Sequence, residues 1–377
     1  MNIYDYIEEY GKYTFNEKKI NEVDLVIFSF LSYASLDKIF EDTKSITIGE
    51  AGSKFIKLYR TKDINIFAVR EANKILKSIR NSERYKDCLL FNYEYTGNKL
   101  LQFGAVSIEY LPNKVYVSFE GTDSLFSGWR ENFMLGYEFP TISHKAAIKY
   151  LNRHFTFSNK ELIVGGHSKG GNLALVASMY TNLFVRRKIT KVINADGPWR
   201  LDREYKSKRY KNLKKKYIHI IPNYSLIGIF LNNSNDYVVK SFTKGILAHD
   251  IAYWEVDANH FVRTKLSAYS RELDKNIDKW FNKYEKQDKA DFINNLDLIL
   301  EEAEVFSILD IKRRKRKILS IIHSSKNMNN KTKKVIVEFI GIIIKCFGDA
   351  KKIEIKDFIT NTFKIPNREK DNNIWNL

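Results

Sequence analysis

Cysteine is scarce in this chain of 377 residues, which contains only Cys88 and Cys346. Two cysteines make neither a disulfide framework nor the paired spacing of a zinc site, and they suit a reducing compartment. The chain also lacks an apolar run of the ~18 residues that a membrane-spanning helix needs. Residues 1–6 show neither the basic nor the apolar region of a secretory signal. We therefore expect a cytoplasmic protein.

The chain also lacks internal repeats, low-complexity tracts and any Pro/Gly/Ser-rich linker. Residues 1–95 have mostly helical patterns, including an expected amphipathic helix over 25–31 that begins after residues 21–24. Helical patterns return after about residue 268, for example over 289–306 and 331–347. We predict a helical N-terminal part over residues 1–95, an α/β core over 96–268, and a helical extension over 269–377 packed on that core.

The middle of the chain alternates between strand-like and helix-like segments. The runs 101–110 and 115–120 predict a hairpin, because a Pro-Asn turn joins two β-rich segments. Further strands are expected over 161–165, 191–195, 217–221 and 237–240, with a helix over 170–180. Strands that alternate with helices favour a mostly parallel sheet with helices on both faces.

Acidic residues are fewer than basic ones, and the formal net charge is +18. Two basic clusters stand out, over residues 203–216 and in the unbroken run 312–317. Such clusters are attracted to anionic surfaces, so we expect peripheral contact with an anionic membrane beside the active site. A plain solvated face is the alternative. No nucleic-acid-binding motif accompanies the charge, so we expect no nucleic-acid partner.

A G-x-S-x-G pattern occupies residues 166–170, between the apolar run 162–164 and a helix-like run over 172–180. A serine in this strand–turn–helix setting is typical of a nucleophile elbow, whose tight turn requires glycine beside the nucleophile. The serine hydroxyl then lies at the carboxyl edge of a sheet and the amino end of a helix. Backbone N–H groups and the helix dipole stabilise an oxyanion there. We predict that Ser168 is a nucleophile.

A serine nucleophile needs a base within hydrogen-bond reach and a third group that orients the base. In α/β-hydrolases these residues follow in the order Ser, acid, His. The histidines after the elbow are His219, His249, His260 and His323. His219 lies inside a predicted strand, and His323 lies in the helical tail. We predict that His249 is the base, with His260 as the fallback and a surface or capping histidine as the alternative.

The orienting acid has two candidates. Asp196 ends a predicted strand in an Asn-Ala-Asp-Gly-Pro turn, so it would lie at the same sheet edge as Ser168. Asp236 comes just before the next strand. An aspartate before glycine also commonly bonds its own backbone in a turn, which is the alternative for Asp196. We predict Asp196 as the acid and keep Asp236 as the second candidate.

An oxyanion hole is expected where residues 118–123, Ser-Phe-Glu-Gly-Thr-Asp, end a strand in a turn. The N–H of Thr122, with or without its hydroxyl, is predicted to pair with the N–H of Lys169, the residue after the nucleophile. A Gly-Thr-Asp turn alone is weak evidence. Its place about fifty residues before an elbow makes it much stronger.

Two segments together resemble the class 3 lipases: residues 117–123 (VSFEGTD) and 165–174 (GGHSKGGNLA). The chain is more closely similar to a bacterial lipase-like α/β-hydrolase family of largely unassigned function, and the likeness covers most of its length. Further similar segments are 2–5, Phe15, 21–24, 31–33, 128–133, 194–198, 221–222, 226–228, 237–241 and 249–250 with Trp254.

The resemblance implies an α/β-hydrolase fold and serine-dependent hydrolysis of a carboxylic ester, by a lipase, esterase or phospholipase. It implies an ester or lipid substrate and neither metal nor organic cofactor. One position departs from the pattern. Class 3 lipases place the acid in a turn after the strand that matches 217–221, and here that turn carries Ser225 in place of aspartate.

Some other lipases carry the acid one strand earlier, which matches Asp196. A triad without its acid would lose several orders of magnitude in rate, because the wrong tautomer of the histidine would prevail. The alternative function is therefore a catalytically impaired α/β-hydrolase-fold module that binds a lipid or a partner.

Overall fold

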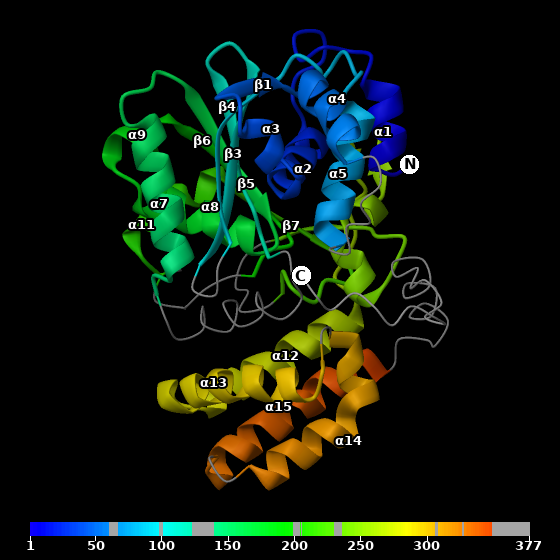
Figure 1. Ribbon diagram of the computed structural model, residues 1–377, viewed down its shortest axis with the longest axis vertical. Coiled ribbons are helices and arrows are strands. Elements are labelled where there is room, and N and C mark those ends of the chain that lie inside the picture. Colours follow the sequence, from blue (N-terminus) through cyan, green and yellow to red (C-terminus); the bar gives the residue numbers. More distant parts are fainter. Residues whose placement is uncertain are drawn as a thin grey trace, which may run out of the picture.

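The protein is represented by a computed structural model (Figure 1). It describes residues 1–59, 67–97, 101–122, 139–198, 204, 206–229, 236–305, 308–325 and 328–348. The strands are β1 Ser45–Thr47, β2 Leu89–Gly97, β3 Gln102–Leu111, β4 Lys114–Phe119, β5 Glu161–His167, β6 Ile189–Ala195, β7 Tyr217–Pro222, β8 Tyr237–Val239, β9 Val256–Asp257 and β10 His260–Phe261. The helices are α1 Ile3–Tyr10, α2 Glu22–Phe30, α3 Asp37–Phe40, α4 Ile48–Leu58, α5 Phe67–Ile79, α7 Ile142–Phe155, α8 Lys169–Tyr180, α9 Leu183–Lys188, α11 Lys208–Leu213, α12 Ala268–Lys283, α13 Lys286–Glu302, α14 Ile308–Ser324 and α15 Asn330–Gly348.

One sheet organises the fold. Strands β1 to β8 lie side by side in the order of the sequence. Neighbours from β1 to β4 are antiparallel, and those from β4 to β8 are parallel. The predicted hairpin is β3–β4, and each of the four other predicted strands is present. The sheet and its flanking helices confirm the expected α/β-hydrolase-like fold.

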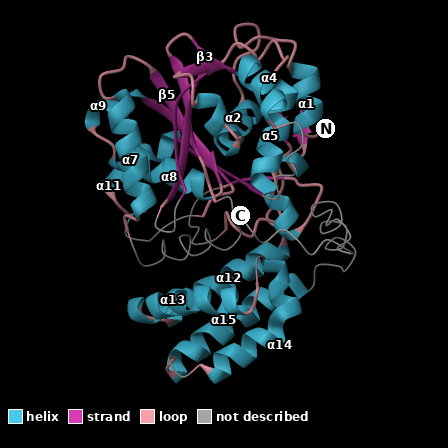
Figure 2. Cartoon of the chain, in the orientation of Figure 1, coloured by secondary structure: helices cyan, strands magenta, loops and turns pink. Residues whose placement is uncertain are grey.

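Helices cover both faces of the sheet (Figure 2). The connections between β4, β5, β6 and β7 all run in one direction, so right-handed crossovers place α7, α8 and α11 on one face. Alternate residues of β4 show the division. Val115 and Val117 pack with α7 and α8, whereas Tyr116 packs with the N-terminal helices α1, α2, α4 and α5. Two apolar cores therefore sandwich the sheet.

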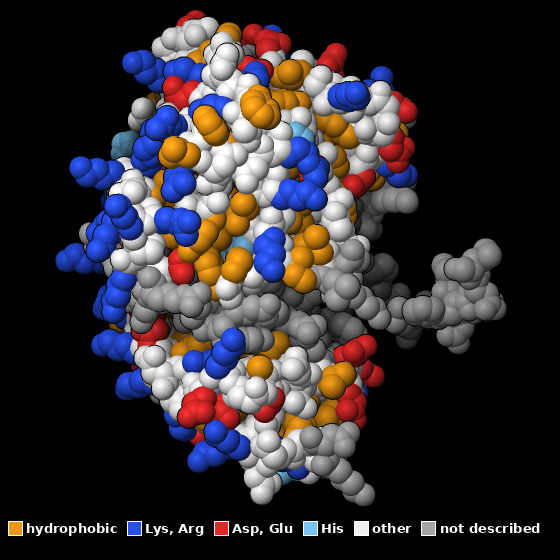
Figure 3. All heavy atoms as spheres, turned by 90° about the vertical axis from the view of Figure 1, so that its left-hand side faces the viewer, with side chains coloured by type: hydrophobic (Ala, Val, Ile, Leu, Met, Phe, Trp, Pro, Cys, Tyr) orange, Lys and Arg blue, Asp and Glu red, His pale blue; other side chains and the backbone are white. Residues whose placement is uncertain are grey.

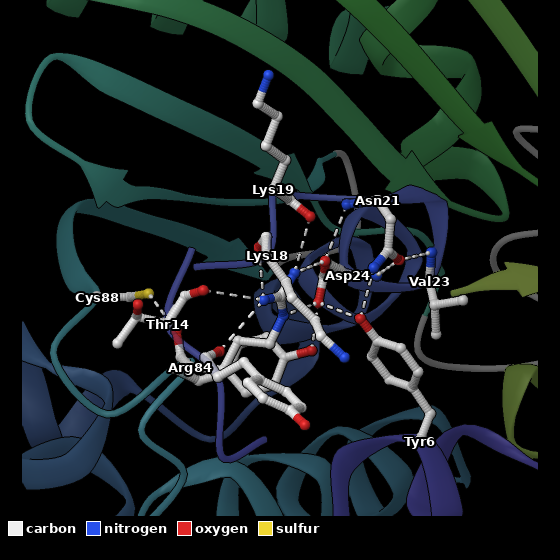
Figure 4. Close-up of polar contacts among 11 residues, drawn as sticks. Tyr6, Thr14, Lys18, Lys19, Asn21, Val23, Asp24, Arg84 and Cys88 are labelled. Atoms are coloured by element: carbon white, nitrogen blue, oxygen red, sulfur yellow. Dashed lines mark hydrogen bonds and ion pairs between the residues drawn. The ribbon is translucent and has the colours of Figure 1, made fainter. Parts of the chain in front are cut away.

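Helix α2 differs from the expected amphipathic helix, because residues 23–30 are all buried. Its N-cap Asn21 and Asp24 form a capping box. Asp24 is fully buried and pairs with Arg84, with 2.6 Å between Asp24 Oδ2 and Arg84 Nη2. Tyr6 donates a hydrogen bond to Asp24 Oδ1 (Figure 4). Tyr85 donates a second one to the same oxygen. A buried charge needs such a complete set of partners, and here it ties the N-terminal helices together.

The C-terminal helices α12 to α15 form a separate group below the sheet in Figure 1. Their apolar sides make a third core, which Ile221 and Leu226 also join. In the first half of α15, Val335 and Ile336 are buried whereas Val337 is exposed. The division of the chain at residues 95 and 268 stays a prediction. Among the described residues, no helix has both the length and the apolar character needed to cross a membrane.

Candidate active site

The G-x-S-x-G turn lies where β5 ends and α8 begins. Ser168 has φ 56° and ψ −133°, a conformation that is costly for a residue with a side chain. Its N–H donates to Ala195 O at 2.9 Å, and its carbonyl accepts from Gly171 N at 3.0 Å. The turn therefore has the strained geometry of a nucleophile elbow.

Both glycines of the pattern are required by close packing. A Cβ at Gly166 would lie 2.5 Å from the carbonyl oxygen of Phe119, and one at Gly170 would lie 2.0 Å from the same atom. These neighbours are backbone atoms, which cannot move aside as a flexible side chain could. The end of β4 therefore packs against the turn at both Gly166 and Gly170. This contact brings the segment after Phe119 beside Ser168.

Asp196 and His249 form a hydrogen-bonded pair at the same edge of the sheet. The distance between His249 Nδ1 and Asp196 Oδ2 is 2.6 Å. Asp196 directly follows β6 and has a left-handed φ of 49°, which aspartate tolerates better than most residues. The Asp196 side chain is fully buried, whereas that of His249 is 20% exposed. When the carboxylate accepts from Nδ1–H, the second ring nitrogen of His249 is free to act as a base.

Two further groups hold the carboxylate from the other side. The Ser225 hydroxyl donates to Asp196 Oδ1 at 2.5 Å, and the Gly228 N–H donates to the same atom at 3.0 Å. The turn in which class 3 lipases carry their acid therefore faces Asp196 here. The serine that replaces the expected aspartate is a hydrogen-bond donor to the carboxylate from the neighbouring strand.

His167, the residue before Ser168, contacts His249. His167 Nε2 lies 2.9 Å from the carbonyl oxygen of His249, and the two imidazole rings are 4.3 Å apart. Burial holds the pKa of His167 well below its usual range, so its ring is neutral and Nε2–H is the donor. Tyr33 donates its hydroxyl proton to the backbone carbonyl of His167 at 3.1 Å. His249 is thus tied both to the elbow and to Asp196.

The other candidates lie elsewhere. Asp236 pairs with His219, with 2.7 Å between Oδ1 and Nδ1. His219 is buried in β7, and its Nε2 lies 3.0 Å from Gly197 O. His260 is exposed in β10, and His323 is exposed in α14. Neither the fallback base nor the second acid is part of the pair beside the elbow.

The Ser168 hydroxyl forms no hydrogen bond with any residue in the described ranges. Ser168 is nevertheless largely buried, with 8% of its surface exposed. Catalytic hydrogen bonds are often long in ligand-free enzymes and tighten when substrate binds. A contact between Ser168 Oγ and His249 would have to form in this way.

A comparison with models of known protein families identifies the family to which this chain belongs. The family model described as Mbeg1-like matches residues 79–297, which is more than half of the chain. The chain belongs to the Mbeg1-like family. The matched region includes Ser168, Asp196 and His249, and it confirms the resemblance to a lipase-like family.

One solved structure with some similarity to this member of the Mbeg1-like family is the crystal structure of M37 lipase. The sequence identity is 14% and the TM-score is 0.35. The match covers 54% of this chain and 68% of the other. No curated protein matches the chain.

Burial sets the electrostatics of the pair. It raises the pKa of Asp196 to about 8, while the Ser225 hydroxyl and the Gly228 N–H favour the ionised carboxylate. Burial also lowers the pKa of His249 to about 3, so the imidazole does not become a cation near neutral pH. A neutral imidazole is the form that can accept a proton from serine. Ionisation of Asp196 therefore controls which ring nitrogen of His249 carries the proton.

Replacing Ser225 with alanine tests this dependence. The variant loses one donor to the buried carboxylate, so the pKa of Asp196 rises further. A raised pKa means that the carboxylate is ionised only at higher pH. We expect the acidic limb of the kcat/KM profile to move up by about one pH unit, with activity regained at alkaline pH. A profile that keeps its midpoint and only loses amplitude would contradict this role of Ser225.

The predicted oxyanion residues flank the elbow. Lys169 is the first residue of α8. A Cβ added at Gly121 would lie 3.1 Å from Ser168 Cβ, which places the residue before Thr122 against Ser168. The Thr122 hydroxyl is buried and has no partner among the residues that the structure describes. An unpaired buried donor beside a nucleophile fits a group that bonds only the transition state. Asp123 and residues 125–133 lie outside the described residues.

Replacing Thr122 with valine is expected to lower kcat about 10²-fold with little change in KM, because the lost donor would act only on the oxyanion. The shape of the side chain is retained. Steady-state kinetics with a soluble ester would measure both constants. Thr190, an exposed threonine in β6, offers a control, and Thr190→Val should leave kcat unchanged. A Thr122→Val enzyme with wild-type kcat would exclude the hydroxyl from the oxyanion hole.

Proposed function

We propose that the protein is a serine hydrolase that cleaves carboxylic esters through an acyl-enzyme on Ser168. The proposal rests on one observation above all, the buried Asp196–His249 pair at the edge of the sheet where the strained serine turn lies. A carboxylate that orients a histidine beside a serine at an elbow is the constellation of acyl-transfer enzymes.

In the proposed reaction, His249 Nε2 removes the hydroxyl proton of Ser168 as the serine oxygen attacks the acyl carbon. The N–H groups of Thr122 and Lys169, together with the Thr122 hydroxyl, donate hydrogen bonds to the oxyanion of the tetrahedral intermediate. When the carbon–oxygen bond to the alcohol breaks, His249 returns the proton to the leaving alcohol. Water then attacks the acyl-enzyme with the same base, which releases the carboxylic acid and restores Ser168. Asp196 keeps the proton of His249 on Nδ1 throughout.

The substrate class follows from the family rather than from the site geometry. Similarity to class 3 lipases supports a lipid ester, so a lipase, an esterase or a phospholipase fits. We further propose that the protein acts in a reducing compartment such as the cytoplasm. The buried Cys88, which is a free thiol, is consistent with that setting.

A fluorophosphonate probe tests the proposal directly, since it forms a covalent adduct only with an activated serine. The wild-type protein should be labelled, and mass spectrometry should locate the adduct on the peptide that contains Ser168. Ser168→Ala should not be labelled. Equal labelling of the two proteins would refute the assignment of the nucleophile.

The second candidate function is a lipid- or partner-binding module without catalysis. It is favoured by Ser225, which stands where class 3 lipases have their acid, and by the absence of a hydrogen bond from the Ser168 hydroxyl within the described ranges. The Asp196–His249 pair weighs against it, because it provides a carboxylate from another strand. A protein that binds lipid but reacts with no fluorophosphonate and hydrolyses no ester would support this candidate.

A further inference from the structure

Positive charge gathers on the face of the molecule that carries α7, α9 and α11. Residues 145–191 contain nine lysines and arginines and one acidic residue, Glu161, and residues 206–216 contain seven basic residues and no acidic one. Figure 3 shows this side, where Lys and Arg side chains spread over the half of the molecule that contains the sheet, with apolar side chains among them. An open hollow of about 540 Å³ along α7 is lined by Lys145, Ile148, Lys149, Asn152 and Arg153. Basic residues therefore outnumber acidic ones on this face, although Arg153 forms an ion pair with Glu94 and Lys160 forms one with Glu109.

Large apolar side chains are exposed within this basic face. Phe157 is 98% exposed, Phe184 is 64% exposed and Leu183 is 52% exposed. Of the six residues of α9, only Val185 is buried. The core therefore does not require the other apolar side chains of this helix. Isolated exposed apolar residues are common, but three that lie together mark an interaction site.

Hydrogen bonds hold Phe157 and α9 side by side. The N-cap of α9, Asn182, donates from Nδ2 to Thr156 Oγ1 at 2.7 Å. At the other end of α9, Lys188 Nζ donates to the backbone oxygens of Phe155 at 2.7 Å and Thr156 at 3.0 Å. Both ends of the helix are thus bonded to the residues just before Phe157. Phe157 is therefore exposed next to a segment that hydrogen bonds hold in place.

We define the α9 patch as the exposed residues Phe157, Leu183, Phe184, Arg187 and Lys191. Lys216 extends its charge, because Lys216 Nζ donates to Ile189 O, the first residue of β6. The predicted basic cluster over 203–216 thus adjoins the patch, apart from Arg203, which lies outside the described residues. In the other cluster, Arg314 and Lys317 form ion pairs with Glu304. These two side chains therefore face a local carboxylate instead.

We infer that the α9 patch docks the protein on an anionic lipid bilayer. Exposed aromatic and leucine side chains enter the boundary between head groups and acyl chains, and surrounding cations bind anionic head groups. Each basic residue near such a surface raises the partition coefficient about fivefold. The charge of the face matches an anionic membrane, and its apolar residues match the layer below the head groups.

The position of the patch separates docking from catalysis. Lys191 lies at the beginning of β6, whereas Ser168 follows the end of the parallel strand β5. Lys191 is in register with Ile163, five residues before Ser168, so the two sites are about 17 Å apart along the strands. The expected docking beside the active site stays a separate prediction. Docking through the α9 patch does not involve Ser168, so it does not depend on the proposed function.

Vesicle cosedimentation tests the inference. Wild-type protein should bind vesicles that contain 30% phosphatidylglycerol in phosphatidylcholine, and binding should weaken as salt rises. The double variant Phe157→Ala/Phe184→Ala should bind at least tenfold more weakly. The matched control is Phe242→Ala/Leu298→Ala, which removes two residues that are 57% and 63% exposed elsewhere on the surface and should bind like the wild type. Both variants should keep wild-type thermal unfolding and wild-type hydrolysis of a soluble ester.

Several outcomes would overturn the inference. Wild-type protein could ignore the anionic vesicles or bind purely phosphatidylcholine vesicles equally well. The two double variants could lose binding to the same degree, which would remove the assignment to the α9 patch. Binding to a DNA duplex in place of vesicles would show that the basic face serves a different polyanion.

A different outcome would leave the docking inference standing. An inactive protein that still binds vesicles through Phe157 and Phe184 would refute the hydrolase proposal alone.

Discussion

The Ser168→Ala variant is expected to hydrolyse a p-nitrophenyl ester with a kcat about 10⁶-fold below that of the wild type. The loss is this large because the hydroxyl is the atom that bonds the acyl carbon, and the remaining members of a triad cannot act without it. The residue is held in a strained turn by backbone contacts, so alanine should occupy the site without altering the fold. Substrate binding should change little, and the loss should fall on kcat.

Ser178 provides the matched control for this variant. It lies on α8 with Ser168 at its N-cap, and its hydroxyl is buried without a hydrogen-bond partner among the described residues. Ser178→Ala should therefore keep wild-type activity and equal or greater stability. A Ser168→Ala protein with more than about 10% of wild-type activity would show that hydrolysis takes place at another residue.

The Asp196→Asn variant is expected to lose about 10⁴-fold in kcat, because an amide would stabilise the wrong tautomer of His249. The substitution keeps the shape of a fully buried side chain. The effect should be on rate rather than on KM, since Asp196 contacts His249 and not the substrate. Circular dichroism and thermal unfolding would establish that the variant is folded.

Asp236→Asn is the comparison that separates the two candidate acids. Asp236 bonds His219 in β7, so its replacement should change kcat less than tenfold. If instead Asp236→Asn caused the larger loss and Asp196→Asn were nearly wild type, the assignment of the acid would be wrong. Similar small losses in both variants would show that neither carboxylate is needed to orient the catalytic base.

Much of the fold was predictable because its signals are local. The hairpin β3–β4, the strand β5 and the helix α8 follow from runs of β-rich residues, a Pro-Asn turn and the glycine pattern around Ser168. The character of α2 was not predictable in the same way. Its spacing suggested one apolar face, but α2 packs between the sheet and other helices, which buries even the polar Asp24.

The candidate active site likewise has a part that was predictable from local motifs and a part that was not. Ser168 and the place of Thr122 could be identified because each lies in a short motif at the end of a strand. The support of Asp196 by Ser225 was missed, although the serine had been noticed as a departure from the lipase pattern. The signal available was that the turns after β6 and β7 lie at neighbouring positions of a parallel sheet.

The sequence by itself determined the serine turn, the basic character of the chain and the strands β3 to β8, because these depend on neighbouring residues and on composition. Only the tertiary structure decided which carboxylate meets His249, since that pair is 53 residues apart and its contact depends on how loops leave adjacent strands. The same holds for His167 and His249, which are 82 residues apart. The tertiary structure also brought Phe157 and Phe184 together, because exposure and proximity are properties of the packed molecule rather than of any segment.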